Sequence, residues 1–119
     1  MPSMPKPDPH LLQRMEGLLA ALPARKRLMF GTAAWFADSN AQMFAGVWGD
    51  RVNVRVGKDA VSELVDSGGA DPFEPMPGRP MKEYVLLDVA SVSDAAGLRS
   101  WIERGLEFAE SLPPKRKRR

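Results

Sequence analysis

The sequence predicts one α+β domain, in which an antiparallel sheet packs against helices from the start, the middle and the end of the chain. Gly49-Asp50 lies between two runs of β-forming residues and is a signal for a tight hairpin. Apolar residues at helical spacing occur near both ends of the chain and in its middle. Strands and helices do not alternate regularly, and this order favours an antiparallel sheet over a parallel one.

The first predicted element is an amphipathic helix, which follows a proline-rich segment at residues 1–7 that we expect to be disordered. Asp8 is placed to cap this helix. Pro9 suits its first position, because the N–H that proline lacks would be unpaired there. The helix is expected to stop before Pro23. Its apolar stripe consists of Leu11, Leu12, Met15, Leu18, Leu19 and Leu22.

Three strands are predicted between residues 28 and 56, arranged as a meander. Apolar residues run from Leu28 to Ala37 and predict the first strand, and a turn at residues 38–41 leads to the hairpin. The residues before the meander are interpreted as a solvated loop that complements the negative end of the first helix, with anion binding as the alternative. These residues are Arg25, Lys26 and Arg27.

The predicted hairpin register separates side chains by polarity. Its apolar face pairs Met43 with Val56, Ala45 with Val54 and Val47 with Val52. The opposite face carries Phe44, Gly46, Trp48, Arg51, Asn53 and Arg55. Aromatic rings beside cations can stack nucleobases, pair within the chain, lie beneath a helix or form a homodimer interface. The candidate interaction face is therefore Phe44, Trp48, Arg51 and Arg55.

The second half of the chain is predicted to add two helices and one or two strands. A helix at residues 59–66 is followed by the stop signal Gly68-Gly69. Prolines between residues 71 and 78 restrict any strand there to a short edge strand, and residues 81–89 return to strand composition. The last helix is expected to start at Ser93-Asp94 and to end before Pro113-Pro114. Its apolar stripe is Leu98, Trp101, Ile102, Gly105, Phe108, Ala109 and Leu112.

Positive charge is concentrated in a C-terminal tail, residues 113–119, that we expect to be disordered beyond a domain at residues 8–112. The tail ends in Lys115, Arg116, Lys117, Arg118 and Arg119. The preceding 114 residues carry 15 acidic and 12 basic side chains, a net charge of about −3. This argues against a duplex-binding surface on the domain. The tail is a candidate contact for nucleic acid or another polyanion, or a solubilising end.

Most residues needed for common catalytic and metal sites are missing. The sequence has no cysteine, and its one histidine, His10, lies at the start of the first helix. This excludes disulfides and thiolate sites, and it leaves zinc and Ser-His-Asp sites without enough ligands. A cation site made of carboxylates, such as those of Asp38 and Asp50, is an open alternative. We expect no enzyme, no cofactor and no metal.

Short segments along the chain resemble those of one bacterial family. They are Met29-Phe30-Gly31, Met43-Phe44-Ala45, Gly69-Ala70-Asp71-Pro72-Phe73, Gly78-Arg79-Pro80-Met81 with Tyr84, and Leu98, Trp101, Ile102, Arg104, Leu106 and Ala109 in the last helix. In this order, over residues 10–112, the chain resembles the TfoX/Sxy N-terminal domain. The resemblance implies a small α+β module associated with regulation, and it supplies no catalytic residues.

Two departures limit what the resemblance implies. The turn at residues 38–42 is longer than the family's Asp-Gly-type loop. The competence regulators that name the family also carry a C-terminal domain, whereas this sequence ends at its basic tail. We therefore expect a stand-alone bacterial, cytoplasmic domain that contacts a protein partner or forms a homo-oligomer such as a dimer. Weak nucleic-acid binding is the alternative, and no membrane association is expected.

Overall fold

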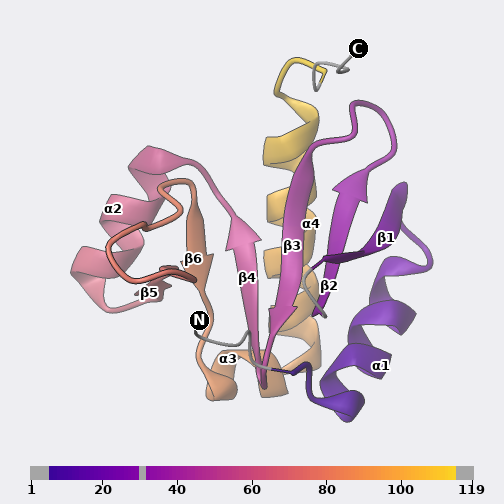
Figure 1. Cartoon of the computed structure of the whole chain (residues 1–119), viewed down its shortest axis with the longest axis horizontal. Helices are drawn as coiled ribbons and strands as arrows, with labels where there is room; N and C mark the ends of the chain where they lie inside the picture. The colour runs from indigo at the N-terminus through magenta and orange to yellow at the C-terminus, as the bar shows by residue number, and fades with distance from the viewer. Residues whose placement is uncertain (1–5, 30–31, 115–119) are drawn as a thin grey trace.

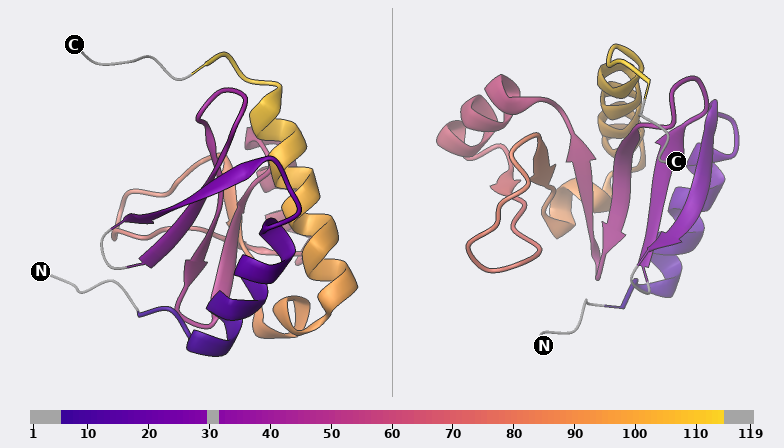
Figure 2. Two further views of the ribbon diagram at one scale, coloured as in Figure 1. Left: turned by 90° about the vertical axis from the view of Figure 1, so that its right-hand side faces the viewer. Right: turned by 45° about the horizontal axis from the view of Figure 1, so that its top comes forward.

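Six antiparallel strands form one sheet, and α1, α3 and α4 cover one of its faces (Figures 1 and 2). The structure, a computed structural model, describes residues 6–29 and 32–114. The strands are β1 (Ala24–Met29), β2 (Thr32–Ala37), β3 (Met43–Trp48), β4 (Arg51–Arg55), β5 (Asp71–Pro72) and β6 (Tyr84–Leu86). The helices are α1 (Pro9–Leu19), α2 (Lys58–Ser67), α3 (Val89–Ser93) and α4 (Ala95–Glu110). Neighbouring strands lie in the order β1-β2-β3-β4-β6-β5, and the predicted α+β class is confirmed.

Helix α1 begins as its sequence predicts. The Oδ2 atom of Asp8 accepts a hydrogen bond from the backbone N–H of Leu11 at 2.9 Å, and Pro9 is the first helical residue. Leu11, Met15 and Leu19 are buried because they lie on the face toward the sheet. The helix ends at Leu19, one turn earlier than the proline alone would require.

The prediction of a three-stranded meander is wrong at its start, where the structure has two strands. The apolar run from Leu28 to Ala37 contains the end of β1 and all of β2. Arg25, Lys26 and Arg27 are not a connecting loop but the middle of β1. The outer edge of an edge strand, and often both of its faces, lie in solvent. Such a strand therefore tolerates consecutive charged residues, which are otherwise typical of a loop.

The hairpin between β3 and β4 has the predicted register, with Val47 opposite Val52 and Ala45 opposite Val54. A β-bulge between β2 and β3 changes which face of the sheet the preceding residues of β3 point to. Trp35 pairs with Ala45 but Phe36 pairs with Met43, so Phe44 is an extra residue without a partner.

The bulge overturns the predicted placement of two side chains. Phe44 joins the main core on the helix-covered side with Ala45, and it is fully buried. Met43, predicted to be on that side, instead packs with Trp48 on the other face. The alternation of a regular strand fails here because the extra residue shifts the phase of the side chains by one.

The second half of the fold matches the predicted pattern, with one added helix. Helix α2 ends at Ser67 and is capped by Gly68, which has a left-handed φ of 79°, and β5 is a two-residue edge strand. The strand predicted at residues 81–89 is shorter, because α3 begins at Val89. Asp88 caps α3, and the hydrogen bond from the backbone N–H of Ser91 holds the pKa of the Asp88 carboxyl below its ordinary value.

The main core lies between the sheet and helices α1 and α4. Helix α4 lies against β3 and β4 at Gly105, where an added Cβ would lie 2.8 Å from Val54 Cγ1 and 3.0 Å from the backbone oxygen of Phe44. The largest fully buried side chains are Phe44, Met15, Leu87, Leu98, Ile102, Val47, Val52, Val54 and Val85. In the described part of the chain, no helix has the length and apolarity needed to cross a membrane.

Candidate functional site

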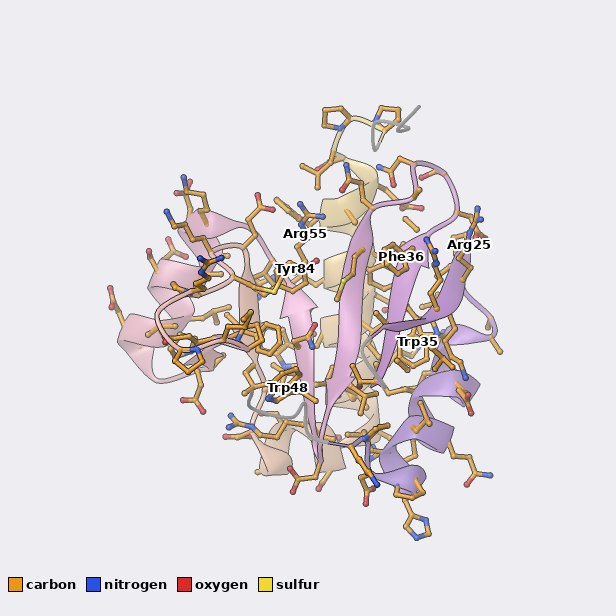
Figure 3. The ribbon with its side chains drawn as sticks, viewed as in Figure 1. Arg25, Trp35, Phe36, Trp48, Arg55 and Tyr84 are labelled. Atoms are coloured by element: carbon orange, nitrogen blue, oxygen red, sulfur yellow. The ribbon has the colours of Figure 1, made fainter. Side chains whose placement is uncertain are left out.

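The sheet face opposite α1 and α4, here called the open face, carries a second cluster of apolar residues. Figure 3 looks onto this face, with Trp48, Arg55 and Tyr84 over its centre and Arg25 at its outer edge. Phe73, Tyr84 and Leu86 form the buried part of the cluster. The connection from β5 to β6 supplies Phe73 and Met81, so this connection covers part of the face that the helices leave exposed.

Trp48 is fixed on the open face by an aromatic contact. Its ring lies edge-on to that of Phe73, with 5.2 Å between the ring centroids. This geometry suits the quadrupoles of the two rings and holds the connection against the sheet. Trp48 is half-buried, so the contact covers part of its ring and leaves the rest accessible.

Arg51 connects the middle of the sheet to its short edge. Its Nε atom donates to the backbone oxygen of Leu87 at 2.8 Å, and Nη2 donates to Asp71 Oδ2 at 2.5 Å. Asp71 begins β5, so this guanidinium ties β4 to the β5–β6 pair. The positive charge of Arg51 is therefore paired with a carboxylate of the same domain.

Arg55 is held in a network at the end of β4. Its Nε and Nη2 atoms donate to Glu83 Oε1 at 2.9 and 2.7 Å, and Nη1 donates to Gln42 Oε1 and to the backbone oxygen of Met43, both at 3.1 Å. The guanidinium also lies over the ring of Tyr84, 5.7 Å from its centroid. Burial raises the pKa of Tyr84 to about 12, against the lowering effect of the Arg55 charge.

The candidate interaction face is therefore only partly assembled. Trp48, Arg51 and Arg55 lie together on the open face, each engaged by neighbours within the domain. Phe44 is buried on the other side of the sheet and cannot contact a partner there. Residues 1–5 of the segment predicted to be disordered (1–7) and the five basic residues 115–119 of the predicted tail (113–119) lie outside the described residues.

Possible ligands for a metal ion are scattered. His10 is exposed on the first turn of α1. Among the residues that the structure describes, no three histidine, aspartate or glutamate side chains lie close enough together to hold a metal ion.

The edge strand β1 is a basic surface, whose residues the sequence interpretation assigned to a solvated loop with anion binding as the alternative. Arg25, Lys26, Arg27 and Leu28 are all exposed, and Leu28 exposes 74% of its surface. Their pairing with β2 places Arg25 and Arg27 on the open face, and Lys26 and Leu28 on the other face. A usable signal was present, because Arg-Lys-Arg-Leu-Met extends into the apolar run without a turn residue.

The charges of β1 have weak partners within the domain. Arg25 Nε lies 3.6 Å from Asp38 Oδ1, with both side chains at least half exposed. Lys26 pairs with Glu16 of α1. The guanidinium of Arg27 lies over the ring of Phe36, 5.6 Å from its centroid. Exposed ion pairs contribute little to stability, so an incoming anionic group can compete for these cations.

These features define a two-layer α+β domain: an antiparallel sheet with helices on one face, a partly covered second face and a basic edge strand. The chain belongs to the TfoX N-terminal domain family, whose sequence profile matches residues 16–109. The matched region includes every strand, the end of α1 and nearly all of α4. No match was found among curated proteins.

Proposed function

We propose that the protein is a non-enzymatic binding domain that takes up an acidic, extended segment of a partner protein along the edge of β1. The observation that carries the proposal is the exposure of Arg25–Leu28 at the end of the strand order. Within the described residues, the backbone of this stretch makes no hydrogen bond to any element other than β2. An edge of this kind presents N–H and C=O groups to which another strand can bind.

The positive charge of β1 favours an acidic partner. An added strand would place its side chains beside Arg25 and Arg27 on one face and beside Lys26 on the other. Acidic residues opposite these cations stabilise the pairing, and the backbone bonds supply affinity that does not depend on sequence. A second copy of the chain is disfavoured, because antiparallel pairing centred on Lys26 places Arg25 opposite Arg27 and Lys26 opposite its own copy.

The resemblance to competence regulators supports a regulatory role in the bacterial cytoplasm. Weak nucleic-acid binding is a second candidate, favoured by the three consecutive exposed cations of β1. Stacking of nucleobases on aromatic side chains has less support, since Phe44 is buried and Phe36 is only 5% exposed.

Peptide titration by calorimetry tests the proposal. The probe is a peptide of alternating glutamate and valine, and its matched control has the same sequence with every backbone nitrogen methylated, so that neither edge of the peptide can donate a hydrogen bond. We expect saturable binding of the first peptide and loss of binding with the second, because methylation blocks strand pairing and keeps the charge. Arg27→Glu should weaken binding at least tenfold, whereas Arg99→Glu on the exposed side of α4 should not.

Three outcomes would contradict the proposal. Equal binding of both peptides would show attraction by charge alone. Tighter binding of single-stranded DNA, with a steep dependence on salt, would favour the nucleic-acid candidate. A dimer in a light-scattering concentration series that Arg27→Glu strengthens would identify a second copy as the occupant of the edge.

A further inference from the structure

A hollow of about 230 Å³ lies on the open face, between the sheet and the connection from β5 to β6. Strands β2, β3 and β4 form its floor. Its lining is almost entirely apolar and includes Trp48, Phe73 and the three methionines Met43, Met76 and Met81. Met76 lines the hollow and is 49% exposed, so it borders both the hollow and solvent. The hollow is separate from the outer edge of β1, because none of residues 24–29 lines it.

One polar group lies in this apolar lining. Asn53 stands in the middle of β4, directly opposite Gly46 of β3. A Cβ added to Gly46 would lie 3.1 Å from Asn53 Nδ2 and 3.2 Å from Oδ1, so the glycine leaves the space that the amide group occupies. The pair Gly46–Asn53 therefore forms a flat floor with an amide group in it.

The side-chain oxygen of Asn53 is not satisfied by the residues that the structure describes. Asn53 is only 3% exposed, and its Oδ1 atom is buried without a hydrogen-bond partner among the described residues. An unpaired buried acceptor destabilises a fold by about 1–3 kcal/mol, and leucine would fill similar space without this penalty. A donor from a bound molecule would remove the penalty.

We propose that the hollow binds a small, flat, apolar molecule, of one or two aromatic rings, with a single N–H or O–H group directed at Asn53 Oδ1. The size fits, because an apolar cavity of about 150 Å³ in another protein holds benzene. Trp48 and Phe73 offer ring edges to an aromatic ligand, and the methionines offer flexible thioethers that adapt to its shape.

The test uses two probes that differ by one donor, indole and N-methylindole. Each is titrated into the isotope-labelled full chain and followed by NMR at the amides of Gly46 and Asn53 and the ring N–H of Trp48. We expect saturable shifts at these groups and about tenfold tighter binding of indole, since one hydrogen bond to a buried acceptor has that effect. In Asn53→Leu both probes should bind with equal affinity, because no acceptor remains.

Met76→Lys is the second variant, chosen because this half-exposed side chain can change without disturbing the core. A charge in the apolar lining should weaken both probes several-fold and leave their ratio unchanged. The proposal is overturned by equal affinities in the natural sequence, by shifts that map elsewhere, or by an indole preference that persists in Asn53→Leu. Peptide binding at β1 does not depend on these variants, so failure here and failure of the proposed function are distinguishable.

Discussion

The side-chain amide of Asn40 donates a hydrogen bond to the backbone oxygen of Ala109 at 2.7 Å, and so joins the turn after β2 to the end of α4. The same nitrogen lies 3.0 Å from the oxygen of Leu112. Asn40 is 9% exposed, and the neighbouring Ala41 takes a left-handed φ of 61°. The long turn noted in the sequence therefore caps the C-terminal end of a helix with its side chain.

Replacing Asn40 by alanine should lower the free energy of unfolding by about 1–3 kcal/mol, because the oxygens of Ala109 and Leu112 lose their donor. Urea denaturation followed by circular dichroism measures the change. Ser39→Ala, in the exposed part of the same turn, is the control and should have little effect. Equal effects of the two substitutions would show that the capping bonds contribute nothing.

Gly105→Ala should destabilise the domain by about 1–3 kcal/mol, because its Cβ would clash with Val54 and with the backbone of Phe44. Gly17→Ala in α1 should instead stabilise it by about 0.5–1 kcal/mol, since an added Cβ meets no atom within 4 Å. Thermal denaturation of both variants measures the difference. A stable Gly105→Ala variant would mean that α4 packs farther from the sheet.

The contact between Arg55 and Glu83 should have a measurable coupling energy of about 1 kcal/mol, because their side chains are only 17% and 31% exposed. A double-mutant cycle with alanine at each position isolates it. The exposed pair Arg99–Glu103 on α4 serves as the reference and should give less than half of that value. Identical couplings would indicate that burial does not strengthen the Arg55 network.

Stability should fall between pH 10 and pH 12 because of Tyr84, the only tyrosine in the chain. In the folded state its pKa is about 12, whereas an exposed tyrosine titrates near 10, so the unfolded state loses its proton first as the pH rises. The contribution is fully present below pH 10 and decreases by about 1.4 kcal/mol per unit of pH above it.

The absorbance of tyrosinate measures the Tyr84 pKa directly, without interference from a second tyrosine. Tyr84→Phe should remove the loss of stability that is specific to this interval, while other groups continue to titrate in both proteins. A midpoint near pH 10 in the folded protein would mean that the ring is exposed to solvent.

Local signals in the sequence predicted several elements correctly. The Gly49-Asp50 hairpin sets its own register because turn type fixes which residues pair, and Asp8 caps α1 because capping depends on adjacent residues only. Prolines near β5 restrict it to a short edge strand for the same local reason. The family assignment rests on the ordered set of such segments and is confirmed.

Features that depend on distant residues were not predictable in this way. The reversal between β1 and β2 is different, because Gly31 stands in the sequence between the paired residues Met29 and Thr32 and is a local turn signal that the prediction did not use. The contact of Asn40 with α4 joins residues about seventy positions apart, and no sequence pattern marks it. The prediction of the candidate site was the least accurate, because the face assigned to Phe44 assumed that β3 has no bulge.

The extra residue at Phe44 also affects how β3 tolerates changes in length. When Phe44 is left out, the other five residues of β3 alternate regularly between the two faces, and Phe44 adds a second consecutive side chain to the core. A deletion at Phe44 would thus keep Met43 on the open face and Ala45 in the core. A deletion elsewhere in β3 would exchange the two faces upstream of it, so length variation among related chains should concentrate at this residue.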